Sequence, residues 1–395
     1  MQPINPTYAK TFAPPVMEAR RWILGQSFAP ERPLINLSQA APVEPPPEAL
    51  VRAMAEAMIT DPASHLYGPV LGLHDLRAEL AAQWSVGYGG AIRPAQVAVT
   101  AGCNQAFTAA MSTLAGAGDE VILPLPFYFN HKMWLDMEGV RAVSLPTGDH
   151  LLPDPEQAAS LITDRTRAIV LISPNNPAGV EYPAPLLRAF YALARRHGLA
   201  LILDETYRDF HSGTGAPHDL FIDPDWDKTL IHLYSFSKAY RLTGHRVGAI
   251  MASEARLAEV EKFLDTVAIC PPQVGQIGAL WGMRHLGDWL AGERAEILAR
   301  RDTVRREFAR LPAWQLLGCG AYFAYVRHPF ALPSDQVAQR MVGAAALLVL
   351  PGTMFGPRID QGGTGQAEAT LRIAFANADA TGLVSVVDRL AVLDL

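Results

Sequence analysis

The sequence has few cysteines, no clusters of charge and no long hydrophobic run. Its three cysteines, Cys103, Cys270 and Cys319, are odd in number and far apart among 395 residues, which argues against a disulfide framework and against a zinc site. Charged residues make up 18% of the chain, the net charge is −6, and no Lys/Arg-rich tract is present, so nucleic acid is not an expected partner. The most apolar run, 343–350, is too short to cross a bilayer, and no basic segment followed by an apolar one marks a secretory signal. We therefore expect a cytoplasmic protein without a metal, membrane or nucleic-acid partner.

Short apolar segments alternate with helix-like segments through the middle of the chain. Each apolar segment is a nearly continuous hydrophobic run, as expected for strands that helices cover on both faces. The pattern predicts an α/β fold with a mostly parallel central sheet. The predicted strands span 96–100, 120–123, 141–145, 168–172, 200–203, 229–234 and 247–251.

The two ends of the chain have a different character from its middle. Residues 1–47 are rich in proline, and a long charged helix is predicted at 293–311, followed by strands near 320–327, 347–350 and 371–375. We expect a large domain at 48–290 and a smaller α+β domain at 291–395. The N-terminal segment 1–47 is expected to pack with this smaller domain.

The segment around Lys238 is the strongest chemical signal. Ser235 and Ser237 precede the lysine, and Arg246 follows eight positions later. A lysine that forms a Schiff base needs a lowered pKa, which burial or nearby positive charge supplies. Hydroxyls and a guanidinium beside it suit a phosphate, and the combination points to pyridoxal 5′-phosphate (PLP). A lone lysine at a strand end is more often a surface residue, but this context favours the cofactor.

Two polar segments follow apolar strands at the end where open α/β sheets bind their ligands. Asp204 ends one strand, and an acid there suits a protonated pyridine nitrogen; the less favoured alternative is a helix N-cap. Tyr207, three residues on, suits a hydrogen bond to the ring's phenolic oxygen. Asn176, in Ser-Pro-Asn-Asn-Pro-Ala-Gly, suits the same oxygen or simply forms a tight turn.

A strand–glycine–helix turn lies at Gly102, Cys103 and Asn104. Free N–H groups and the helix dipole make such helix starts favourable for phosphate. Many turns of this kind bind nothing, so the signal is weak alone. We expect the backbone of Cys103 to matter, and not its thiol.

Three further residues are candidates whose ordinary interpretation is structural. Tyr128 suits stacking on a ring, although most aromatic residues belong to a core. Tyr67 lies in a Gly/Pro-rich loop that is able to reach a second subunit. Arg372 lies inside an apolar strand, where it suits bidentate pairing with a carboxylate; the alternative is an internal salt bridge.

In order and spacing, these motifs resemble those of the class I/II aminotransferases of the fold-type I PLP enzymes, the group that includes aspartate aminotransferase. The resemblance runs from Ile35 to the C-terminus. Its motifs are Tyr67-x(4)-Gly72, Gly102-Cys103-Asn104, Pro126-Phe127-Tyr128, Asn175-Asn176-Pro177-Ala178-Gly179, Asp204-Glu205-x-Tyr207, the Lys238 segment, Pro351-Gly352-Thr353-x-Phe355-Gly356 and Arg372.

The resemblance implies a role for each matched residue. Lys238 would be the Schiff-base lysine and proton shuttle, and Asp204 would pair with the pyridinium, supported by His131. Asn176 and Tyr207 would contact the phenolic oxygen, and Tyr128 would stack on the ring. Arg372 would bind the substrate α-carboxylate, with Asn176 and Ala40 beside the substrate. The residues implied around the phosphate are Gly102, Cys103, Asn104, Ser235, Ser237 and Arg246, with Tyr67 of the partner subunit in a homodimer.

Two positions depart from the family pattern. Ala40 replaces a usual glycine in the N-terminal loop, and Arg241 stands where a small or uncharged residue is usual. Arg241 is either a surface charge or an extra anion contact near the site. The expected activity is ping-pong transfer of an amino group between an L-amino acid and a 2-oxo acid. The alternative is a carbon–sulfur β-lyase or a γ-eliminating synthase on the same scaffold, because PLP supports each of these reactions.

Overall fold

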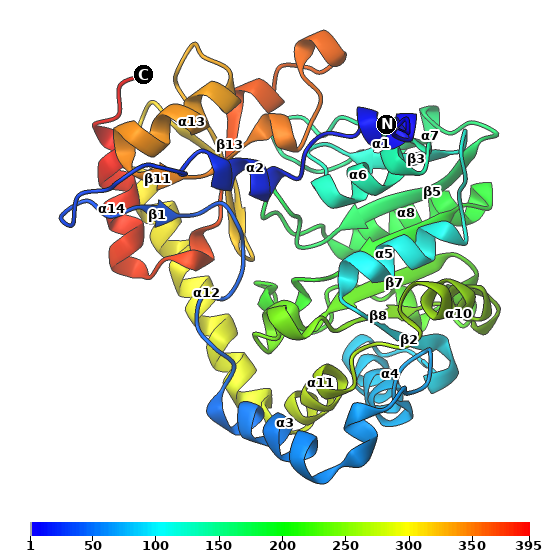
Figure 1. Cartoon of the computed structure of the whole chain (residues 1–395). Coiled ribbons are helices and arrows are strands. Elements are labelled where there is room, and N and C mark those ends of the chain that lie inside the picture. Colours follow the sequence, from blue (N-terminus) through cyan, green and yellow to red (C-terminus); the bar gives the residue numbers. More distant parts are fainter. Residues whose placement is uncertain (1) are drawn as a thin grey trace.

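The structure, a computed structural model, describes residues 2–395 and is built around a seven-stranded sheet (Figure 1). The strand order is β2-β8-β7-β6-β5-β3-β4. Strand β8 runs antiparallel to both of its neighbours, while β4, β3, β5, β6 and β7 pair in parallel. The segment 236–247 that joins β7 to β8 contains only the short helix α9 (Phe236–Ala239) and one 3-10 turn, whereas parallel strands are usually joined by a longer helix. The bounds are β2 Val97–Thr100, β3 Glu120–Pro124, β4 Arg141–Leu145, β5 Thr166–Ile172, β6 Ala200–Asp204, β7 Leu230–Ser235 and β8 Gly248–Met251.

Helices cover both faces of this sheet. Along β6, Leu201 and Leu203 join one hydrophobic cluster while Ile202 joins another, because successive side chains of a strand point to opposite faces. The first cluster packs against α3 (Glu48–Thr60), α4 (His74–Tyr88), α7 (Pro155–Ser160), α8 (Ala184–His197) and α11 (Gln273–His285). The second packs against α5 (Cys103–Ser112), α6 (Phe129–Met137) and α10 (Glu254–Ala268).

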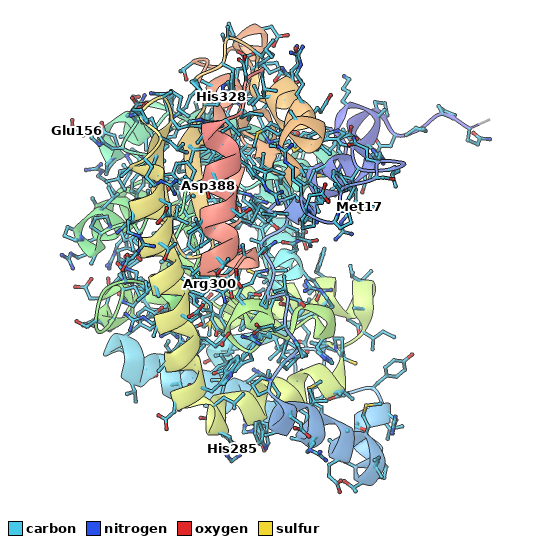
Figure 2. All side chains as sticks on the ribbon, turned by 90° about the vertical axis from the view of Figure 1, so that its left-hand side faces the viewer. Met17, Glu156, His285, Arg300, His328 and Asp388 are labelled. Atoms are coloured by element: carbon cyan, nitrogen blue, oxygen red, sulfur yellow. The ribbon has the colours of Figure 1, made fainter. Side chains whose placement is uncertain are left out.

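Both chain ends build a second lobe. Strands β12 (Leu350–Pro351), β13 (Thr370–Ile373), β10 (Phe323–Arg327) and β9 (Gln315–Gly320) form an antiparallel sheet in that order. The N-terminal β1 (Ile35–Asn36) pairs in parallel with β11 (Leu347–Leu348). Helix α12 (Gly287–Phe308) extends from the large sheet to this lobe and lies beside α14 (Ala380–Ala391) (Figure 2). The remaining helices are α1 (Pro6–Lys10), α2 (Pro15–Arg21), α9 (Phe236–Ala239) and α13 (Ser334–Ala345).

The expected fold class is confirmed, and each of the seven predicted central strands is present with its bounds shifted by at most two residues. The long helix begins at Gly287, earlier than the predicted 293, because its first turns lack the charges on which the prediction relied. The antiparallel direction of β8 was not predicted. The division at 48 and 291 stays a prediction. None of the helices within residues 2–395 is both long and apolar enough to span a membrane.

Candidate active site

The carboxyl ends of the parallel strands open into a cavity of about 540 Å³. This is the edge where open α/β sheets bind ligands. Segments that follow β3, β5, β6 and β7 meet there with the start of α5 and with β13. Of the residues singled out from the sequence, those that line the cavity are Ala40, Cys103, Asn104, Tyr128, Asn176, Asp204, Tyr207, Ser235, Ser237, Lys238, Arg246 and Arg372.

Lys238 lies on the short helix α9, directly after β7. The Ser235 hydroxyl accepts a hydrogen bond from the Ser237 amide at 3.2 Å, which caps this helix. The Lys238 Nζ donates to the Ala40 carbonyl at 2.6 Å. Burial, assisted by the charges of Arg246 and Arg372, lowers the pKa of Lys238 to about 7. Near neutral pH, a large fraction of this amine is therefore unprotonated and nucleophilic.

Asp204 is a buried acid that faces the cavity from the end of β6. Its Oδ1 accepts from the Thr206 amide at 2.9 Å, and its Oδ2 lies 3.5 Å from His131 Nε2. The His131 ring stacks on Phe107 with a centroid distance of 3.8 Å. Burial acts to raise the pKa of Asp204, but the contacts with His131 and Thr206 outweigh it and lower the pKa. Asp204 is therefore an anion inside the cavity.

Arg246 and the start of α5 form one corner of the cavity. The Arg246 guanidinium donates to the Ser237 hydroxyl at 3.3 Å and to the Thr243 carbonyl at 3.0 Å. Gly102 has a φ of +87°, and a Cβ there would lie 2.0 Å from Arg246 Nη2, so only glycine leaves room for the guanidinium. Gly102 thus lies behind the corner and does not line the cavity. Hydroxyls, a guanidinium and a helix start together favour a phosphate.

Arg372 is a buried cation at another side of the cavity. It donates to Asn176 Oδ1 at 3.0 Å and to the Ser38 carbonyl, and its Nε has no partner. Within residues 2–395, no carboxylate lies within 4 Å of Arg372, so the alternative of an internal salt bridge is wrong. Burial lowers the pKa of Arg372 to about 10. A carboxylate ligand would satisfy this guanidinium.

Two phenols complete the cavity wall. Tyr128 donates to Asn104 Oδ1 at 3.5 Å and accepts from Asn130 Nδ2 at 3.0 Å. Burial, together with the charge of Asp204, raises the pKa of Tyr128 to about 12. Burial also raises the pKa of Tyr207 well above its usual value. Both phenols are neutral hydrogen-bond donors at physiological pH.

Sequence reasoning missed one wall of the cavity. Helix α2 and the residues before it contribute Pro14, Val16, Met17 and Arg20. The only local signal was the pair Pro14-Pro15, which suits a helix start but says nothing about where the helix lies. Tyr67 is 79% exposed and does not line the cavity of this single chain.

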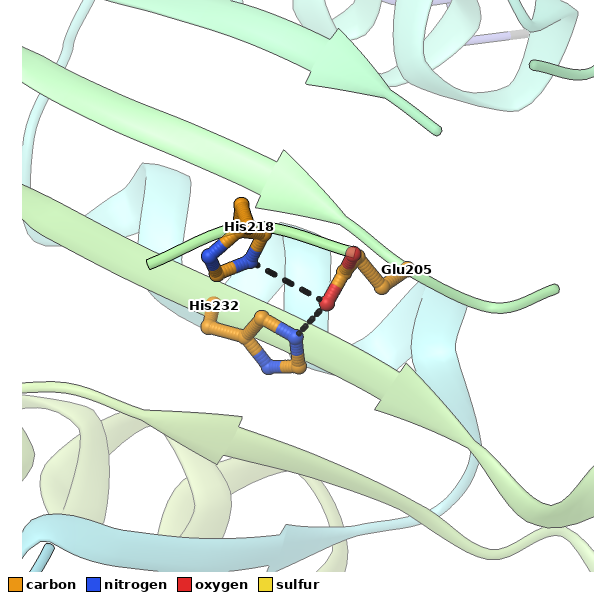
Figure 3. A group of neighbouring side chains, drawn as sticks. All are labelled: Glu205, His218 and His232. Carbon is orange, nitrogen blue, oxygen red and sulfur yellow. Dashed lines mark hydrogen bonds and ion pairs between the residues drawn. The ribbon is translucent and has the colours of Figure 1, made fainter. Parts of the chain in front are cut away.

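A second acid, Glu205, follows Asp204 in sequence but does not line the cavity. Figure 3 shows Glu205 with His218 and His232. Glu205 is fully buried with His218 and His232, and its Oε2 lies 2.7 Å from His232 Nε2 and 3.4 Å from His218 Nε2. The Tyr88 hydroxyl donates to the same oxygen. Glu205, His218 and His232 have side chains of the types that bind metals. However, His218 Nδ1 accepts the Leu220 amide at 3.2 Å, so a neutral His218 carries its proton on Nε2 and offers no lone pair there. The geometry favours a buried acid–histidine–tyrosine network centred on Glu205 Oε2, in which Glu205 Oε1 and His232 Nδ1 have no hydrogen-bond partner among residues 2–395.

Comparison with known proteins agrees with this geometry. The sequence profile described as aminotransferase class I and II matches residues 32–390. The aromatic aminotransferase ISS1 of Arabidopsis thaliana is 29% identical over 90% of both chains. The arginine–pyruvate transaminase AruH of Pseudomonas aeruginosa is 30% identical over 82% of this chain and 83% of its own. The structure of Thermus thermophilus aspartate aminotransferase with maleate superimposes with a TM-score of 0.88, at 23% identity and 99% coverage of both chains. The chain belongs to the class I and II aminotransferases, enzymes that transfer amino groups with the help of PLP.

Proposed function

We propose that this cavity binds PLP and an amino acid together and is where the chain carries out transamination. One observation supports this most strongly. Lys238 lies between two arginines, Arg246 and Arg372, and within residues 2–395 neither has a carboxylate within 4 Å. A buried charge is costly unless it is paired, so two unpaired cations in one cavity favour the binding of two anions. The phosphate of the cofactor suits Arg246, and the α-carboxylate of the substrate suits Arg372.

The proposed cofactor cage uses the groups around Lys238. The phosphate is held by two hydroxyls, one guanidinium and the first amides of α5, which belong to Ser235, Ser237, Arg246, Cys103 and Asn104. Gly102 leaves room for these groups. Asp204, kept ionised by His131 and Thr206, holds a proton on the ring nitrogen. Tyr207 and Asn176 donate to the phenolic oxygen, and the Asn176 amide nitrogen is available because its oxygen accepts from Arg372. Tyr128 packs against the ring.

The reaction then depends on proton movement by Lys238. Bound PLP supplies an aldehyde carbon that takes up the amino group and a ring that withdraws electrons from the substrate. Arg372 orients the substrate so that its α-hydrogen faces the Lys238 amine. Lys238 removes this proton and delivers it within the cavity, and a pKa of about 7 suits both steps. A positioned general acid–base group of this kind typically contributes about 10²–10⁴-fold.

Amino acids and 2-oxo acids are the substrates of this enzyme class, and the individual donor and acceptor are best found by a screen. Amino donors are paired with 2-oxoglutarate, pyruvate or oxaloacetate while the absorbance change between the pyridoxal and pyridoxamine forms of the enzyme is followed. Turnover that requires both partners supports the proposal. Release of pyruvate from a thioether amino acid without any acceptor would instead support the lyase alternative, which no feature of residues 2–395 favours.

We also propose that the enzyme is a cytoplasmic homodimer in which Tyr67 of the partner subunit reaches the phosphate. Supporting this, Ile59, Leu66 and Tyr67 lie within nine residues of chain and are 81%, 66% and 79% exposed on the single chain, as expected of side chains that a partner subunit covers. Light scattering at assay concentration is expected to give twice the mass of 42.8 kDa. A fully active monomer would contradict the proposal.

A further inference from the structure

The unusual arginine at position 241 does not contact the cavity. It is absent from the cavity wall, and its guanidinium pairs with Glu293 on α12 through two hydrogen bonds of 2.9 Å. The same group lies 2.6 Å from Glu44 Oε2 and donates to the Pro45 carbonyl at 3.2 Å. Two acids already surround this one cation, so the local charge does not favour a substrate anion. The idea of an extra anion contact therefore has no support here.

What Arg241 contacts is the segment Leu37–Pro45, named here the strap. It continues from β1 and runs beside α12 toward α3 (Figure 1). After Leu37 the strap takes part in no strand pairing, so side chains from elsewhere satisfy its backbone carbonyls. Arg372 donates to Ser38, Asn377 to Gln39 at 2.5 Å, and Lys238 to Ala40 at 2.6 Å.

The contacts of Arg241 hold the far end of this strap. Only 16% of its side chain is exposed, and its guanidinium lies 5.4 Å from the centre of the Trp289 ring on α12. A two-bond pairing with a carboxylate fixes the plane of the guanidinium as well as its position. Arg241 thereby joins three segments, namely α12, the strap and the turn that follows Lys238.

Arg241 is also fixed to the lysine through the backbone. Its amide donates to the Lys238 carbonyl at 3.4 Å, and its own φ is +57°. A residue with a Cβ adopts this conformation only where its surroundings hold it. Because Lys238 and Arg241 lie on one turn of chain and both donate to the strap, they set the distance between the lysine and the strap at two points.

We infer that Arg241 is a positioning residue that holds the strap over the cavity, so that the Ala40 carbonyl meets the Lys238 amine. The inference names a role for a residue of the proposed site and rests on the proposed function of Lys238. Gln39, Ala40 and Ala41 of the strap line the cavity whatever the substrate side chain is. Loss of the Arg241 contacts with Glu44, Pro45 and Glu293 will therefore weaken the binding of all amino donors alike. The turnover of bound substrate will change less.

The test compares three variants of the PLP-loaded enzyme. Arg241→Gln removes the ion pairs with both Glu44 and Glu293. Glu44→Gln removes only the ion pair to the strap, while the Arg241–Glu293 pair remains. Arg284→Gln is the matched control, because it breaks an Arg–Glu pair of 3.0 Å between α11 and α4, which does not involve the strap. Hydrogen exchange of peptides covering 37–45 and steady-state kinetics with a neutral and a dicarboxylic donor are measured for each.

We expect Arg241→Gln to speed amide exchange in the strap by about tenfold and to raise KM for both donors by about the same factor. Its kcat should stay within about threefold, Glu44→Gln should show a smaller change of the same kind, and the control should show none. A KM rise for the dicarboxylic donor alone would overturn the inference in favour of an anion contact. Unchanged exchange in the strap in both Arg241→Gln and Glu44→Gln would also overturn it. The exchange measurement does not depend on catalysis, so a failure of the proposed role of Lys238 would be distinguishable.

Discussion

Asp204 and Glu205 are consecutive buried acids with histidine partners, yet they face different surroundings. Asp204 points into the cavity, and His131 lies 3.5 Å from one of its oxygens. Glu205 lies outside the cavity, and Tyr88, His218 and His232 converge on its Oε2. A buried carboxylate that meets only protein side chains, away from any cavity, serves the fold. A buried carboxylate that remains open toward a cavity is available for a ligand.

The largest expected effect comes from removing the charge that faces the cavity. Asp204→Asn keeps the shape of the side chain but cannot hold a proton on the ring nitrogen as an anion does. We expect kcat/KM to fall by about 10³-fold, with little change in the free energy of unfolding without cofactor. Steady-state kinetics and chemical denaturation of the same preparation measure both quantities. A variant with more than a tenth of normal activity would contradict the role proposed for Asp204.

Glu205→Gln should produce the opposite pattern. Breaking a buried charged network by removing one partner typically costs about 3–5 kcal/mol in the free energy of unfolding. The activity of the folded fraction should stay within a few-fold of normal, because the side chain does not touch the cavity. Denaturant titration combined with active-site counting by PLP absorbance separates the two effects. Full stability together with a thousandfold loss of activity would show that Glu205 acts in the reaction and does not stabilise the fold, which would contradict the contrast drawn with Asp204.

Much of this contrast is invisible in the sequence. The residues singled out from the sequence make up about half of the cavity wall, mostly at strand ends, because parallel strands bring their carboxyl ends to one edge whatever the details of packing. The wall formed by α2 and the residues before it was not predicted. The sequence did not predict that His218 and His232 meet Glu205, or that Arg241 pairs with Glu293. Those contacts depend on how distant segments pack. No local period or spacing encodes them.

A smaller effect is expected at Arg372, the cation that remains open to the cavity. Arg372→Lys keeps a charge but loses the planar fork that matches a carboxylate. We expect KM for every amino donor to rise by about 10- to 100-fold, with a smaller change in kcat. As a control, Arg358→Lys alters an arginine that is already paired with Asp335 at 2.8 Å, and its kinetics should be normal. Equal effects of the two substitutions would argue against a substrate role for Arg372.

The smallest expected effect is on stability in acid. Burial acts to raise the pKa of Glu205, but His218 and His232 outweigh it and hold the pKa well below its usual value. Burial lowers the pKa of His232 as well. Both groups bind fewer protons in the folded state, so the stability they contribute is fully present above their unfolded pKa values, about 4.3 for Glu205 and about 6.5 for His232. It declines as the pH falls from those values toward the lower pKa values of the folded state. Denaturation between pH 7 and pH 3 should show a shallower acid loss in Glu205→Gln than in the unmodified enzyme. An unchanged slope would contradict this.

The most direct test of the proposed site asks which lysine the cofactor binds. The PLP-loaded enzyme is reduced with borohydride, which makes the bond between lysine and cofactor permanent, and its peptides are analysed by mass spectrometry. We predict the pyridoxyl mass on the peptide that contains Lys238, with the exposed Lys262 unmodified. Labelling of another lysine, or none in an enzyme that transaminates, would contradict the placement of the active site between Arg246 and Arg372.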